Sequence, residues 1–198
     1  MPFIFKRLAL FMSIAAAFAA DKEPAPFKAP PAASFVHHDT SDKVTIGAEP
    51  YNSGDKVKVA FGKLDPYEVG VLPVLVVIQN DSSETIRLDT LKVEYVGPNH
   101  RRVTATPAKD VKYLWGVQQP GVLQGPAGRV KVTSKKNPLA AWEIEGRAFA
   151  AQMLPAGNSA SGFFYFHTGL QSGATIYISG LSEAKSGKEL LYFELPLE

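Results

Sequence analysis

The clearest element of this chain is a run of apolar residues with no polar position inside it. It lies within GVLPVLVVIQN, residues 70–80, where every side chain from Val74 to Ile78 is apolar and most are β-branched. A strand with one face in water alternates apolar and polar residues, so a continuous run predicts a central strand buried on both faces. Pro73 has no N–H for a sheet ladder and is expected at the start of this strand or at an unpaired position.

A second pattern, strict alternation, marks residues 91–96. Leu91, Val93 and Tyr95 are predicted to face a core, while Lys92 and Glu94 face water. Other short segments have the composition of strands and are separated by turn residues: 44–48, 86–88, 103–106, 162–167, 174–179 and 189–195. Together these segments predict a mainly β chain folded as a β-sandwich. The expected core includes Leu75, Val77, Tyr95, Phe163 or its neighbour Phe164, and Tyr177.

Three segments depart from strand patterning. Residues 53–61 alternate like a strand, but Ser53 and Asp55 also suit the start of a short helix, and the pattern leaves both open. Residues 107–136 hold several Pro and Gly residues without a sustained period, which predicts a long loop insertion. Residues 138–152 follow an Asn-Pro start and carry large residues at helical spacing, which predicts one helix.

The first nineteen residues have the layout of a secretory signal peptide: Lys6 and Arg7, a short apolar run, and the triplet Ala17-Phe18-Ala19. The run is shorter than the ~20 residues that span a bilayer. We therefore expect cleavage after Ala19, no transmembrane segment in the mature chain, and a periplasmic or secreted protein. Residues 20–43 are rich in Pro and Ala and are predicted to be a flexible arm, with the folded domain at 44–198.

Two segments together carry a resemblance. GVLPVLVVIQNDSSETIRLD is an apolar strand that ends in Asn80 before a polar turn, and MLPAGNSASGFFYF places Pro155 and Gly157 before an aromatic strand. This combination resembles the secreted immunoglobulin-like domains of unknown function found in bacteria, which are similar to the small immunoprotective extracellular families. The resemblance implies an immunoglobulin-like β-sandwich, with one or two short helices in this chain, and a role in binding or presenting a partner. Asn80, Pro155 and Gly157 shape turns in it.

The amino-acid composition limits the kinds of functional site that this chain can have. The chain has no cysteine, which excludes a disulfide framework, a thiol nucleophile and a lipidated cysteine anchor. Basic residues gather between Arg101 and Lys136, where Asp110 is the one acidic residue. The residues expected to form an anion-binding patch are Arg101, Arg102, Arg129, Lys131, Lys135 and Lys136. Export makes nucleic acid an unsuitable target, so the expected partner is an acidic glycan or another envelope protein. The plainer alternative is a solvated loop.

No sequence motif for catalysis or for a cofactor is present, so no cofactor is expected. His37, His38 and Asp39 are adjacent, but neighbouring residues of an extended chain point to opposite sides, so no metal site is expected there. Aromatic side chains at 163–166 and 192–193 are dense, and an outward Phe164, Phe166 or Tyr192 would make a binding surface unless a helix covers it. The sequence thus favours a non-catalytic binding or assembly module. The alternative is a secreted hydrolase with its site in 107–136.

Overall fold

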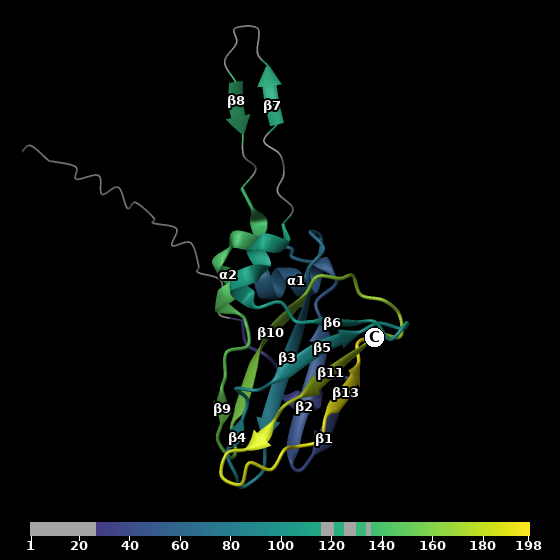
Figure 1. The fold of residues 1–198 in the computed structure, drawn as a ribbon, viewed down its shortest axis with the longest axis vertical. Helices are drawn as coiled ribbons and strands as arrows, with labels where there is room; N and C mark the ends of the chain where they lie inside the picture. Colours follow the sequence, from purple (N-terminus) through teal and green to yellow (C-terminus); the bar gives the residue numbers. More distant parts are fainter. Residues whose placement is uncertain (1–26, 116–120, 125–129, 134–135) are drawn as a thin grey trace, which may run out of the picture.

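A computed structural model describes residues 27–115, 121–124, 130–133 and 136–198, with backbone alone for 121–124 and 130–133 (Figure 1). The chain is mainly β, and every pair of neighbouring strands is antiparallel. The segment 1–19, assigned above to a signal peptide, lies outside the described residues. Within them, no helix has the length and apolar character needed to cross a membrane.

Two four-stranded sheets form the body of the molecule. The first sheet has the order β1 (His38–Ser41), β2 (Val44–Pro50), β3 (Leu72–Asn80), β10 (Ser159–Phe166). The second sheet has the order β13 (Phe193–Pro196), β11 (Thr175–Ser179), β5 (Lys92–Val96), β6 (Arg102–Thr104). A third, small sheet contains β12 (Ser182–Glu183), β4 (Ile86–Arg87) and β9 (Met153–Leu154), and β7 (Gly121–Gln124) pairs with β8 (Val130–Thr133).

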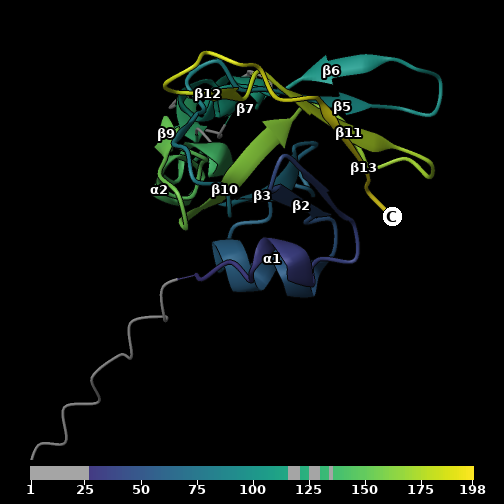
Figure 2. The ribbon, with the colours of Figure 1, turned by 90° about the horizontal axis from the view of Figure 1, so that it is seen from below.

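Strand β3 is buried on both faces, as the unbroken apolar run predicts. Val74, Val76 and Ile78 belong to the core cluster shared with the second sheet. Leu75 and Val77, on the opposite face, belong to a second cluster beneath the helices. Figure 2 shows the resulting layers: the second sheet, then the first sheet, then helix α1 (Gly54–Phe61). Pro73 is paired with Tyr165 near the beginning of the strand.

The segment 53–61, whose sequence suits either a strand or a helix, forms a helix that packs against the first sheet. The structure forms a helix there, with Ser53 at its N-cap and Asp55 in its first turn, where an acidic side chain is favoured by the helix dipole. Val57 and Phe61 are buried against the sheet, whereas Val59 is 73% exposed. Short helical turns complete this layer: η1 (Ala32–Ser34), η2 (Ala108–Leu114), η3 (Pro138–Ala140) and α2 (Trp142–Gly146).

The predicted flexible arm, 20–43, is wrong from residue 27 onward. Ala32 and Phe35 are buried in the cluster beneath the helices, and β1 pairs with β2 along its whole length. A Cβ at Gly47 would lie 2.6 Å from atoms of Ala32 and Phe35, so the missing side chain at this position makes room for the segment. The composition of this segment predicted a linker because it has few large apolar residues. The structure shows that a few buried residues, such as Ala32 and Phe35, are enough to hold the segment against the sheet.

The predicted helix 138–152 is also wrong in length. Helical structure is limited to η3 and α2, and the chain then turns at Arg147 to run beside β10. The N–H of Phe163 donates to the carbonyl of Arg147, and the N–H of Phe149 donates to the carbonyl of Phe163. Backbone pairing with an edge strand thus replaces the helix beyond Gly146, and Trp142 is 70% exposed rather than buried.

Whether the other residues predicted for the core are buried depends on which face of their strand they occupy. Tyr95 and Phe163 are buried, as expected, and Phe164 is half-buried. Tyr177 was expected in the core, but Ile176 and Ile178 on either side of it face inward. Since successive strand residues point to opposite faces, the Tyr177 ring lies on the outer face of the second sheet. In the insertion 107–136, the described residues form η2 and the β7–β8 hairpin.

Asn80, at the end of β3, joins the turns around it. Its side-chain amide donates to the carbonyls of Glu84 and Leu154 at 2.8 and 3.0 Å, and its Oδ1 accepts from the hydroxyl of Ser82 at 2.6 Å. Its backbone carbonyl accepts from the N–H of Gly157, whose φ is +74°. Asn80 is fully buried, so these bonds satisfy polar groups that water does not reach.

Because β3 is buried, two matched substitutions are expected to differ greatly in how much they lower the free energy of unfolding. Val76→Asp places an unpaired carboxylate between the sheets, and we expect a loss of several kcal/mol, enough to unfold a domain of ordinary stability. Val59→Asp introduces the same side chain on the exposed face of α1 and is expected to change stability by less than about 1 kcal/mol. Urea denaturation followed by circular dichroism measures both. Equal losses would contradict the burial of β3.

Candidate functional site

A groove opens where the edges of the two main sheets come together. The N–H of Ala105 donates to the carbonyl of Val93 in the second sheet, and the N–H of Thr106 donates to the carbonyl of Tyr165 in the first. The chain therefore crosses from one sheet edge to the other at this point. We call the hollow beside the crossing the edge groove. Its volume is about 1000 Å³, and its walls come from β5, residues 104–109, residues 148–152 and β10.

The inner wall of the edge groove is aromatic. Phe149 and Phe164 both line it, and their rings are stacked with centroids 5.3 Å apart and planes at 24°. A Cβ at Gly162 would lie 2.3 Å from the Cα of Phe149, so only glycine at this position lets the 148–152 segment approach β10 so closely. Phe164 was one of three aromatic residues proposed for an outward binding surface. The other two are Phe166, which is fully buried, and Tyr192, which is 57% exposed elsewhere.

The rim of the edge groove carries unmatched positive charge. Lys92 and Lys109 both line the groove and are exposed. Neither forms an ion pair within the part of the chain that the structure describes. The carboxylate of Glu94, also at the rim, is paired with Arg102 at 2.8 Å. A positively charged rim around aromatic walls suits a ligand that is apolar and carries acidic groups.

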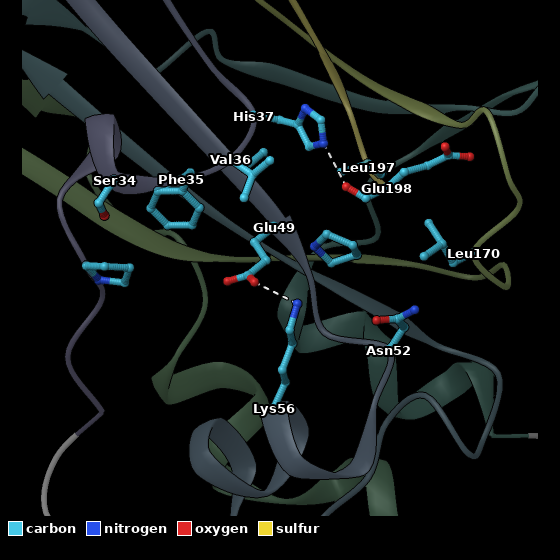
Figure 3. A pocket seen from close by; sticks show the side chains of 13 residues that line it. Ser34, Phe35, Val36, His37, Glu49, Asn52, Lys56, Leu170, Leu197 and Glu198 are labelled. Carbon is cyan, nitrogen blue, oxygen red and sulfur yellow. Dashed lines mark hydrogen bonds and ion pairs between the residues drawn. The ribbon is translucent and has the colours of Figure 1, made fainter.

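A second, smaller pocket of about 420 Å³ lies between the segment around Phe35, the end of β2 and the segment after β13 (Figure 3). Each of its ionisable side chains has a hydrogen-bond partner. Lys56 donates to Glu49 at 2.6 Å, and His37 Nε2 donates to the carbonyl oxygen of Glu198 at 2.7 Å. The carboxylate of Glu198 points away from the Glu49–Lys56 pair in Figure 3.

The Glu198 carboxylate is held by donors outside this pocket. The hydroxyl of Ser172 donates to its Oε1 at 2.6 Å, and the N–H of Gly173 donates to the same oxygen. These hydrogen bonds, with a smaller contribution from the charge of His37, lower the pKa of Glu198. Two carboxylates and a histidine thus line one pocket, but each of them is engaged by a different partner.

The histidines and the basic residues chosen from the sequence are spread over the molecule. His38 Nδ1 donates to the carbonyl of Phe35 at 2.8 Å, whereas His37 reaches Glu198. Among the described residues, no three His, Asp or Glu side chains are grouped in a way that would hold a metal ion. Arg101 directly precedes β6, Arg102 is the first residue of that strand, and Lys136 precedes η3. Arg129 and Lys135 lie outside the described residues, and Lys131 lies in β8, where the backbone alone is described.

Arg102, expected to bind an anion, is engaged within its own sheet. Besides its ion pair with Glu94, its guanidinium lies over the ring of Tyr177, 4.7 Å from the ring centroid. The other neighbour of Tyr177 is Tyr192, stacked at a centroid distance of 5.0 Å. The acidic partner of Arg102 therefore lies across the strand pair β5–β6, on the same face of the second sheet.

Sequence patterning missed the residues that build the edge groove. Phe149 was assigned to a helix, and Lys92 was expected only to face water. Lys109 lies in the basic segment 101–136 but was not among the residues chosen for the anion-binding patch. The signal that would have helped is Gly162, a glycine inside strand β10 directly before its aromatic residues, which marks a close backbone approach.

Comparison with known proteins adds little to this geometry. No family model matches the chain, and no curated protein matches it. A solved structure similar to it is the crystal structure of a functionally unknown protein from Listeria monocytogenes EGD-e. The two share 12% sequence identity over 81% of this chain and 82% of that chain, with a TM-score of 0.33. The site is therefore argued from the side chains of this chain alone.

The side of the molecule shown in Figure 3 gives a prediction for alkaline pH. Burial, and to a smaller extent the charge of Glu49, raises the pKa of Tyr51 to about 12. A tyrosine in the unfolded chain ionises near pH 10. Between these values the unfolded state releases its proton first, so the free energy of unfolding falls as the pH rises. Tyr51→Phe is expected to show a smaller fall between pH 9.5 and 11.5 in urea denaturation. Equal falls in the two proteins would contradict this assignment.

Proposed function

We propose that this protein is a non-catalytic binding module that holds an extended, acidic and apolar segment of a partner protein in the edge groove. The observation that carries the proposal is the pairing of an aromatic wall, Phe149 and Phe164, with the uncompensated charges of Lys92 and Lys109. The volume of about 1000 Å³ is at the upper end of the range for ligand sites and has room for several side chains.

The chemistry of the walls favours a peptide over an acidic glycan. Val93, Ala105, Ala108 and Ala148 line the groove in addition to the aromatic pair. A saccharide presents hydroxyl groups along its whole length, and an apolar wall would leave many of them without hydrogen bonds. An extended peptide instead places alternate side chains toward such a wall while the other side chains remain in water.

Two further features fit a binding role outside the cytoplasm. The sandwich of two antiparallel sheets, with Asn80 and Gly157 at their turns, supports an immunoglobulin-like fold, which commonly presents loops and sheet edges to partners. The signal-like segment 1–19 supports export to the periplasm or the medium. The rival assignment is a hydrolase with its site in residues 107–136. The pocket in Figure 3 contains none of these residues, and its ionisable side chains are each engaged by another group, so it gives that assignment no support.

The test uses two defined peptides of opposite charge, EVFVE-amide and KVFVK-amide, each labelled with fluorescein at its N-terminus. We expect the acidic peptide to bind more tightly, because it matches the lysine rim, and to lose affinity as salt screens the charges. Phe164→Thr keeps a β-forming residue but removes the aromatic wall, so it should weaken both peptides. Lys92→Glu combined with Lys109→Glu should weaken the acidic peptide by about tenfold or more and favour the basic one. Fluorescence anisotropy gives the dissociation constants.

The matched control reverses two charges on the opposite side of the first sheet. Lys58 and Lys63 are exposed, belong to α1 and the turn after it, and form no ion pair among the described residues. Lys58→Glu with Lys63→Glu should leave the affinity for the acidic peptide unchanged. An equal loss in the two double variants, or no preference for the acidic peptide, would overturn the proposal. Tighter binding of polygalacturonate than of either peptide would support a glycan-binding role instead.

A further inference from the structure

Arg147, directly after α2, occupies an unusual setting for a cation. Its Nε is buried and has no hydrogen-bond partner among the described residues. Its guanidinium lies over the rings of Phe27 and Trp142, with the guanidinium carbon 5.6 and 6.0 Å from the two ring centroids. A buried donor of this kind ordinarily has an acceptor, so the lack of one among the described residues calls for an explanation.

A pocket of about 270 Å³ opens beside this arginine. Its lining consists of Phe27, Trp142, Gly146, Arg147, Ala148, Ser161 and Gly162, so it contains no carboxylate. Glu143 and Glu145 lie close by in α2, but no ion pair joins either of them to Arg147. The positive charge in the pocket is therefore uncompensated by the residues that the structure describes.

The same pocket is lined by part of the edge strand β10, some of whose outward backbone groups have no partner among the described residues. Phe163 directs its N–H and its carbonyl away from β3, toward Arg147 and Phe149. In an antiparallel ladder the direction alternates, so Ser161, two residues earlier and opposite Val77, directs its N–H and carbonyl to the same outer edge. Residues 147–149 pair with Phe163, but the residues before Arg147 belong to α2 and form their backbone hydrogen bonds within the helix, so they do not pair with Ser161. Among the described residues, the outward N–H and carbonyl of Ser161 therefore have no backbone partner, and both lie next to Arg147 in the lining of the pocket.

From these observations we infer that this pocket is a carboxylate-binding site for an extended peptide, with Arg147 as the bidentate donor and Ser161 as the backbone anchor. A guanidinium presents two parallel N–H groups that match a carboxylate, and this pairing is stronger where water is partly excluded. The exposed ring of Trp142 provides an apolar surface for the neighbouring residue of the peptide. The carboxylate is either an Asp or Glu side chain or the C-terminus of the peptide.

This site is separate from the edge groove, although Ala148 lines both. The groove uses Lys92, Lys109 and Phe164, and none of these lines the pocket of Arg147. The test is therefore carried out in the Lys92→Glu/Lys109→Glu protein, so that failure at one site does not decide the other.

The probes are acetyl-TVEVT-amide, its Gln counterpart acetyl-TVQVT-amide, and acetyl-TVV with a free C-terminus, each titrated calorimetrically. We expect at least one carboxylate peptide to bind at least about tenfold more tightly than the Gln peptide. Preference for the first or the third peptide identifies the source of the carboxylate. Arg147→Met should abolish the discrimination, and Arg147→Lys should restore part of it, because a lysine keeps the charge but not the fork.

Two substitutions of Ser161 provide a test that still applies if the variants of Arg147 fail to fold. Ser161→Ala removes the hydroxyl and keeps the N–H, so it should bind the carboxylate peptide with little change. Ser161→Pro removes the outward N–H but no bond to β3, and it should weaken binding several-fold while the unfolding midpoint stays close to that of Ser161→Ala. Equal affinity for the Glu and Gln peptides, no heat with any probe, or unchanged binding by Arg147→Met would overturn the inference and leave Arg147 as a packing contact of Phe27 and Trp142.

Discussion

The structure depends on one constraint: β3 is apolar on both faces, so both faces must be removed from water. Pairing within a single sheet covers the edges of β3 but leaves both of its faces exposed, at a cost of roughly 25 cal/mol for each Å² of apolar surface. The second sheet covers Val74, Val76 and Ile78, and the helical layer covers Leu75 and Val77. The three-layer arrangement in Figure 2 follows from this need, and the segment around Phe35 is drawn into the fold because it completes the helical side.

The two proposed binding sites lie along the β10 edge of the first sheet. Strand β10 pairs with β3 on one side. On its other side it forms only single backbone hydrogen bonds with Thr106, Arg147 and Phe149 among the described residues. The gaps between these short contacts are the edge groove and the pocket of Arg147. An edge with unpaired backbone groups also favours strand addition by other chains. In the proposed function, the arginine and lysine side chains beside the gaps would make that addition selective for acidic partners.

The sequence predicted the elements whose pattern is local and failed where partners are distant. The unbroken run in β3 and the alternation in β5 specify burial by themselves, and the mainly antiparallel β architecture followed from them. Tyr177 was placed in the core because aromatic residues usually are, whereas the register of β11 turns it outward. Phe149 and Arg147 carry no signal in their own neighbourhood. Their roles depend on the passage of residues 147–149 beside Gly162, which only the folded chain reveals.

Hydrogen exchange of the backbone amides, resolved by residue in NMR spectra, tests the central position of β3 most directly. Amides that open only when the whole domain unfolds exchange most slowly, whereas edge strands exchange through local openings. The account predicts the slowest exchange for the amides from Val74 to Ile78, which lie between β2 and β10, and faster exchange for β6 and residues 147–149 at the edges. Exchange of the β3 amides at the same rate as those of β6 would contradict it.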